Sequence, residues 1–330
     1  MIASTPVGRW TWGRDDQPRR EIFSCIHDVL AAWFVLARYD LAIGTPGISV
    51  SVHEAGRANS LLFQGQLEPG AAIPASDIAH HLAARVEVER NPGEIGAVYA
   101  DMKITGVVVT GDHATREEEL FLIGSSAVLD YVSTELVTFS DAWMSYDLRG
   151  RAQTAVHAVN APRLSAALLG LSEVLRSEID PDEPTYFAKP TDTGIESYLE
   201  DDGAGSDVWS SFEVPYRYSQ FTHAPGFGQI GYKRSAEGEV LYAPVTAPRG
   251  VLGYLWASDA EQAASFEPRD VGNDESYQSG LLWLSRLRSA HDRGLSPSEA
   301  VAELAGLLNR ELSTVDMASL RELAKQELNP

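Results

Sequence analysis

A single cysteine, Cys25, occurs among the 330 residues of this chain, so no intramolecular disulfide can form and no CxxC metal knuckle exists. Such scarcity is typical of a reducing compartment, and we expect a cytoplasmic protein. Long apolar runs are missing as well. The most apolar stretch, residues 29–37, is far below the roughly 20 residues that cross a bilayer. The first 20 residues contain no apolar segment that could serve as a secretory signal. We therefore expect no membrane partner.

Basic residues are also few. Lys and Arg number 26 against 47 Asp and Glu, which gives a formal net charge of −21. Proteins that bind nucleic acid concentrate Lys and Arg on one face, and a chain this acidic repels a polyanion, so we expect no nucleic-acid partner. The same field attracts a basic protein, although an acidic surface is also a common way to stay soluble.

Recognisable catalytic motifs are missing too: the chain has no GxSxG elbow, P-loop, HExxH or kinase signature. Residues 226–231 match GxGxxG, but a hairpin pattern follows them instead of a helix, so we interpret these glycines as turn residues. Asp77, His80 and His81 have a helical spacing compatible with metal ligands, yet nothing brings His113 close, and solvated histidines are the favoured interpretation. We predict no catalytic residue, metal or cofactor, and leave open whether the protein is an enzyme.

What the chain does contain is enough apolar material, 44% of its residues, for one or two cores. Period-two alternation predicts strands at residues 48–52, 85–89 and 97–109, and a three-and-four spacing predicts a helix over residues 22–36. Asn160 as N-cap and Pro162 in the first turn predict another helix. The fold class is therefore α+β, with an antiparallel sheet and flanking helices in an N-terminal domain.

A change of composition near Gly203, where Gly and Asp accumulate, marks an expected domain boundary. We predict a polar arm over residues 1–20, an α+β domain over residues 21–200 and a smaller α+β domain over residues 208–330. The smaller domain should open with aromatic strands and end in three helices. The second of these helices has the clearest start, because residues 296–299 read Ser-Pro-Ser-Glu, a capping box with proline at the first helical position.

Two segments concentrate the side chains that carry binding energy at interfaces. Residues 141–163 combine aromatic side chains with arginine in an arginine-poor chain, and residues 209–232 hold seven aromatics where composition predicts about two. The alternatives are that Trp143 is core and Asp147 pairs locally with Arg149, and that the second segment is a seam between domains. The candidate binding residues are Trp143, Tyr146, Asp147, Arg149, Arg151, His157, Trp209, Tyr216, Tyr218 and Phe221.

Parts of the chain resemble a known lineage. Residues 141–151 with 160–164, and residues 251–259 with 294–297, resemble a two-domain actinomycete family of unknown function. Similar proteins look like components of polymorphic-toxin or type VII secretion loci, where acidic cytoplasmic immunity proteins are common. The resemblance implies that setting and carries over no catalytic residue.

These observations lead to two hypotheses of different classes. The first is an immunity-type interaction protein that binds and neutralises a basic toxin domain, with carboxylates for steering and aromatic side chains for affinity. The alternative is a small-molecule-binding or enzymatic protein with a cleft between its domains, lined by Trp143, Arg149, Arg151, Tyr216 and Tyr218.

Overall fold

The computed structural model describes residues 1–15, 20–70, 74–111, 113–223 and 229–325. The chain divides into two compact units, an N-terminal unit of Met1–Val208 and a C-terminal unit of Trp209–Pro330, and each is described by itself. Both units mix helices and strands, so the predicted α+β class, with a large antiparallel sheet and C-terminal helices, is confirmed. No helix in the described parts of the chain is both long and apolar enough to cross a membrane.

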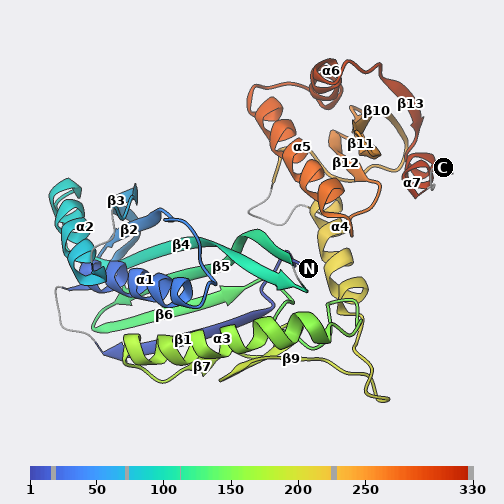
Figure 1. Ribbon diagram of the computed structural model, residues 1–330. Coiled ribbons are helices and arrows are strands. Elements are labelled where there is room, and N and C mark those ends of the chain that lie inside the picture. The colour runs from blue at the N-terminus through green and yellow to red at the C-terminus, as the bar shows by residue number, and fades with distance from the viewer. Residues whose placement is uncertain (16–19, 71–73, 112, 224–228, 326–330) are drawn as a thin grey trace. The chain divides into compact units, whose positions relative to one another are not determined.

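A seven-stranded antiparallel sheet forms the centre of the N-terminal unit (Figure 1). Its strands, in spatial order, are β3 (Arg57–Leu67), β2 (Ile48–Glu54), β4 (Ile95–Thr110), β5 (His113–Val128), β6 (Tyr131–Thr138), β1 (Gly8–Asp15) and β7 (Asp180–Pro181). The strands predicted at residues 48–52 and 97–109 are therefore present. A separate hairpin is formed by β8 (Ala188–Thr191) and β9 (Gly194–Ser197).

Strand β1 replaces the polar arm that we expected over residues 1–20. It pairs antiparallel with β6 along its whole length, and Trp10 and Trp12 are fully buried. The indole N–H of Trp10 donates to the Thr191 carbonyl, and that of Trp12 donates to the Ser172 hydroxyl. The two tryptophans alternate with polar residues, which is the period of a half-buried strand. The prediction of a polar arm was wrong because the many charged residues of this segment hide the alternation of its two tryptophans.

Helices cover one face of this sheet. Helix α1 (Glu21–Arg38) packs on β4, β5 and β6, and α3 (Thr154–Leu175) packs on α1 and β4. Helix α2 (Ala75–Glu89) packs on α1 and β3 and includes residues 85–89, so the strand predicted there is wrong. Ile78, Leu82 and Val86 recur every four residues and are buried, which is a helical stripe that the local alternation obscured.

Helix α3 begins earlier than predicted, at Thr154, and Pro162 lies inside it. Asn160 is therefore no N-cap. Its side-chain oxygen accepts a hydrogen bond from the backbone N–H of Val109, and its amide group donates to the Val109 and Val156 carbonyls. The partner of this buried side chain is thus a strand 51 residues away, which no local pattern reveals.

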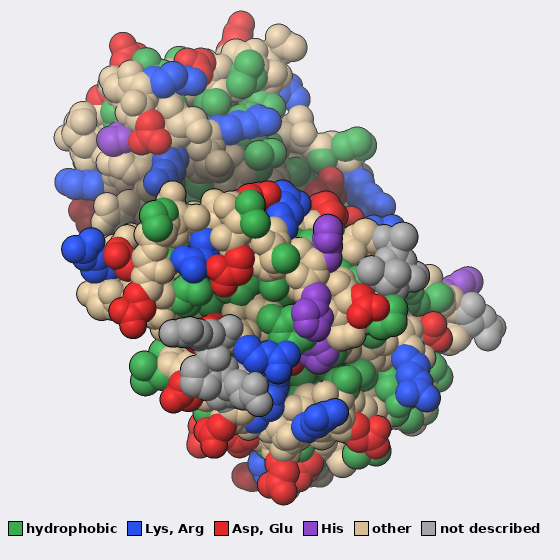
Figure 2. Space-filling view, turned by 90° about the vertical axis from the view of Figure 1, so that its left-hand side faces the viewer, with side chains coloured by type: hydrophobic (Ala, Val, Ile, Leu, Met, Phe, Trp, Pro, Cys, Tyr) green, Lys and Arg blue, Asp and Glu red, His purple; other side chains and the backbone are tan. Residues whose placement is uncertain are grey.

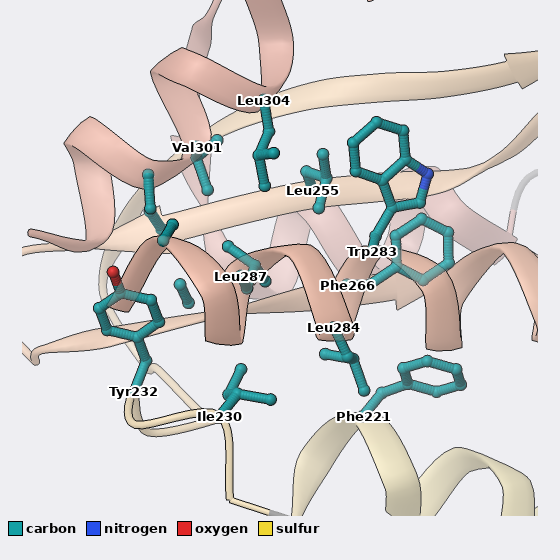
Figure 3. Packing of buried hydrophobic residues seen from close by; sticks show 14 of the residues in the cluster. Phe221, Ile230, Tyr232, Leu255, Phe266, Trp283, Leu284, Leu287, Val301 and Leu304 are labelled. Carbon is teal, nitrogen blue, oxygen red and sulfur yellow. The ribbon is translucent and has the colours of Figure 1, made fainter. Parts of the chain in front are cut away.

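The C-terminal unit holds a four-stranded sheet and helices. In spatial order its strands are β12 (Ala263–Pro268), β11 (Gly250–Ser258), β10 (Glu239–Ala247) and β13 (Ser313–Asp316). The three predicted C-terminal helices are present as α5 (Asp274–Asp292), α6 (Pro297–Leu307) and α7 (Met317–Lys325). Ser296 and Glu299 form the predicted capping box at the start of α6. Figure 3 shows one buried cluster that includes Leu255, Phe266, Leu284, Leu287, Val301 and Leu304.

The aromatic strands expected at the start of this unit are helical instead. One π-helical turn, Trp209–Glu213, leads directly into α4 (Val214–Thr222). Glu213 and Arg217 are one helical turn apart and form a buried ion pair, which ties the two pieces together. Residues 224–228, which include the first half of the GxGxxG match, lie outside the described residues.

Candidate functional site

Several aromatic side chains that we expected at a binding surface are core residues instead. Trp143, Trp209 and Phe221 are 1%, 2% and 1% exposed. Trp143 stacks on Phe121, and its indole N–H donates to Thr138 Oγ1. These positions fill the interiors of their units because large rings gain most free energy when they leave water. Trp143 therefore matches the core alternative.

The polar candidates of residues 141–163 lie in a tight loop whose side chains bond mainly to the loop's own backbone. Asp147 Oδ1 accepts hydrogen bonds from the backbone N–H groups of Arg149 and Arg151, and its Oδ2 accepts one from Arg151 Nε. The Tyr146 hydroxyl donates to the Gly203 carbonyl. Both arginines are exposed and His157 is half-buried. Asp147 thus pairs locally, but its ion pair is with Arg151, and of Arg149 it binds the backbone N–H. A binding role for the exposed side chains stays a prediction.

The remaining two candidates, Tyr216 and Tyr218, lie on α4. Tyr216 is exposed. The Tyr218 hydroxyl donates to Glu267 Oε1 at 3.0 Å, and burial together with that carboxylate raises the pKa of Tyr218 to about 12. Tyr218 is therefore a neutral hydrogen-bond donor at physiological pH and supports the carboxyl of Glu267.

The sheet of the N-terminal unit has a second face, away from α1 and α3, which we had not singled out. Strand register places one row of residues side by side across six strands, and a second row lies next to it. The first row is Thr11, Glu135, Gly124, Asp101, Ser49 and Gln66. The second row is Gly13, Ser133, Ser126, Tyr99, Ser51 and Gln64. We call these two rows the open face.

The open face is polar and shallow. Two depressions of about 340 and 210 Å³ cover it, and Asp101 lines both. Most of the lining side chains are small hydroxyl groups and glycines, so the backbone of the sheet lies close to the surface. Gln66 donates to the hydroxyl of Ser49, which fixes the outer end of the first row. A large partner can therefore approach the strands closely over a broad area.

Two carboxylates converge at the centre of the open face. A methyl group placed on Gly124 would lie 3.1 Å from Asp101 Oδ1 and 3.0 Å from Glu135 Oε1. Partial burial, and then the nearby charge of Glu135, raise the pKa of Asp101. Arg9 Nε lies 3.5 Å from Glu135 Oε2 and 3.8 Å from Asp182, so it shares its charge between two acids. A cation placed above Gly124 would relieve this repulsion.

Only part of this site is readable from sequence. The alternation at residues 48–52 and 97–109 shows that Ser49, Ser51 and Asp101 share the polar sides of their strands. Glu135 and Gly124 join them only through strand register, which depends on hairpins and bulges along β4, β5 and β6. The alternation of polar residues was visible in the sequence, but no local pattern showed which strands pair and in which register.

The histidines considered as metal ligands have other neighbours. His80 Nδ1 lies 2.7 Å from the Ser76 carbonyl oxygen, and its ring packs on Phe23 with the centroids 4.3 Å apart. In the part of the chain that the structure describes, no group of three or more His, Cys, Asp or Glu side chains is arranged to hold a metal ion.

Comparison with known proteins finds no family model, no curated protein and no solved structure that matches this chain. The resemblance to an actinomycete family stays a prediction. The candidate site therefore rests on contacts, charge and register within the chain itself.

Proposed function

We propose that this protein is an acidic interaction protein of the immunity type, which binds and neutralises a basic toxin domain through the open face. The observation that carries the proposal is the pair of carboxylates, Asp101 and Glu135, that meet above Gly124 in the middle of a polar six-stranded surface. In this proposal the two carboxylates, and not the aromatic side chains, make the central contacts with the partner.

The charge of the site favours a basic partner. The chain carries a net charge of −21, so a cationic domain is attracted over a long range. At short range, Gly124 lets the two carboxylates approach each other over the strand, where an arginine or lysine of the partner could bind to both. Close charge pairs at protein interfaces are coupled by about 1.5–7 kcal/mol. One such contact would therefore contribute much of the affinity.

The shape of the site favours a protein over a small molecule. Six strands at a spacing of about 4.8 Å span about 24 Å, which suits an interface of standard size, about 800 Å² on each partner. The two depressions share Asp101 and lie over neighbouring strands of one sheet, so a single broad partner can cover both. A domain held against this face would have its own surface covered, which is how binding would neutralise it.

Affinity capture tests the proposal. The full chain is immobilised and a lysate of the source cells is passed over it at low salt, beside a variant that carries Asp101→Asn and Glu135→Gln. The matched control carries Asp192→Asn and Glu173→Gln, which remove the same charge from exposed positions outside the two rows of the open face. Captured proteins are identified by mass spectrometry, purified and titrated by calorimetry.

We expect a basic protein that the wild type and the control retain and that the open-face variant binds at least tenfold more weakly. Binding should also lower the pKa of Asp101, measured by NMR titration, because a cation favours the charged carboxylate. Capture of no basic protein at low salt, or equal affinity of both variants, would refute the proposal.

A further inference from the structure

A separate pocket of about 410 Å³, open to solvent, lies where β1, the first half of α1 and the end of α3 meet. We call it the arginine pocket. Its lining residues are Arg14, Arg20, Phe23, Ser24, His27, Asp28, Val174, Leu175 and Arg176. Three arginines at one cavity are unusual in a chain with only 26 basic residues and a net charge of −21. Figure 2 shows the side on which α2 lies, where histidine side chains gather next to Lys or Arg side chains.

The only acidic side chain among these lining residues is held by the protein itself. Asp28 is buried, and its two carboxylate oxygens accept hydrogen bonds from Arg14 at 2.6 and 3.0 Å. The hydroxyl of Thr134 donates to the same carboxylate. Bidentate pairing of this kind compensates the buried negative charge. Among the lining residues, Asp28 is thus already paired with Arg14, and no other carboxylate lies there to pair with Arg20 or Arg176.

The other two arginines are available to a ligand. Neither Arg20 nor Arg176 forms an ion pair with a carboxylate among the residues that the structure describes. The Arg20 guanidinium lies over the ring of Phe23, 4.8 Å from its centroid, which holds it beside the pocket. Both side chains come from the ends of helices, Arg20 directly before α1 and Arg176 directly after α3. Their guanidinium groups can bind an oxyanion with paired N–H donors.

Two further polar groups line the pocket from α1. Ser24 is 5% exposed, and its hydroxyl makes no hydrogen bond with any described residue. His27 Nδ1 lies 3.1 Å from Asp28 Oδ1, so the carboxylate accepts from Nδ1–H and orients the ring. The hydroxyl of Ser24 therefore stays accessible from the pocket, where it can donate a hydrogen bond to a polar occupant.

We propose that the arginine pocket binds the phosphoryl group of a small molecule. Arg20 and Arg176 supply the positive charge, and the hydroxyl of Ser24 donates the additional hydrogen bond. The volume lies within the range of small-molecule sites and exceeds what a single phosphate fills, so the ligand carries a further organic part. Phe23, Val174 and Leu175 form an apolar wall for that part. The inference is independent of the open face, because the two sites share no residue.

Calorimetric titration of the full chain with inorganic phosphate, pyrophosphate and AMP tests this inference. We expect saturable binding by at least one phosphate compound, with AMP tighter than inorganic phosphate because of its organic part. Arg20→Gln and Arg176→Gln should each weaken binding about tenfold, the loss of one charged hydrogen-bonded contact. Arg116→Gln, an exposed arginine on β5, is the matched control and should bind like the wild type.

Heat unfolding without ligand shows whether the variants fold, and both arginines are exposed, so we expect unchanged melting temperatures. Ser24→Ala provides a third measurement and should weaken binding without a change of charge. Failure of all three compounds to saturate at millimolar concentrations would overturn the inference. So would equal weakening in Arg116→Gln, because binding would then reflect net charge and no defined pocket.

Discussion

Replacement of Arg217 by methionine should strongly destabilise the C-terminal unit. Its side chain is buried and donates through Nε to Glu213 Oε1 at 2.6 Å, and through Nη1 to Asp274 Oδ1 at 2.7 Å. The guanidinium also lies between the rings of Trp209 and Tyr277, 4.6 Å from each centroid. One side chain thus joins the π-helical turn, α4 and α5.

The size of the effect follows from what the substitution leaves behind. Glu213 is 0% exposed, and a buried carboxylate that loses its cation costs about 3–5 kcal/mol. Asp274 is largely exposed and adds little, because water screens it. Methionine keeps most of the contact with the two rings, so the loss of cation–π attraction adds about 0.5–2 kcal/mol at most. We expect a total of about 3.5–7 kcal/mol, a large part of the stability of a unit this size.

Hydrogen exchange of the full chain, read by mass spectrometry on peptides from α4, α5 and β12, measures this free energy for the C-terminal unit alone. Arg217→Met combined with Glu213→Gln removes both charges and should recover at least half of the loss. Arg286→Met is the control, since Arg286 lies 4.3 Å from the Trp283 ring centroid and forms no ion pair among the described residues. A loss below about 1 kcal/mol in Arg217→Met, or a double variant no more stable than the single one, would refute the reasoning.

Two further predictions concern the same unit. Burial raises the pKa of Glu267, so the folded protein holds this proton more tightly than the unfolded chain does. The protonated carboxyl therefore stabilises the fold fully below about pH 4.3, and this stabilisation is lost as pH rises through the raised pKa. Glu267→Gln keeps an acceptor for the Tyr218 hydroxyl, so the variant should be more stable than the wild type at neutral pH. Its melting temperature, measured by heat unfolding, should also vary less with pH. An unchanged dependence of melting temperature on pH would contradict this. Ser296→Ala removes the acceptor for the Glu299 N–H and should cost about 1 kcal/mol, read from exchange of the α6 amides, whereas Ser296→Asp should restore protection if capping is the cause.

Short-range patterns predicted those elements whose signals lie within a few residues. The alternation at residues 48–52 and 97–109, and the capping box at Ser296, each correspond to an observed element. The same reasoning failed where a local pattern competed with a longer one. In residues 85–89 a brief alternation concealed the stripe of α2, and in residues 8–15 abundant charge concealed the buried side of β1.

Tertiary structure decided which chemistry-bearing side chains meet. The open face joins Asp101 to Glu135 through the register of β4, β5 and β6, and the arginine pocket joins Arg20 to Arg176 through the packing of α1 and α3. Burial of Trp143 and Trp209 was likewise a matter of packing, because the same ring serves a core or an interface.

The sequence by itself determined composition, charge and the periodicity of individual elements, because these depend on residues close together in the chain. Only the tertiary structure decided the partners of each side chain, because strand register and helix packing bring together residues that are far apart in sequence.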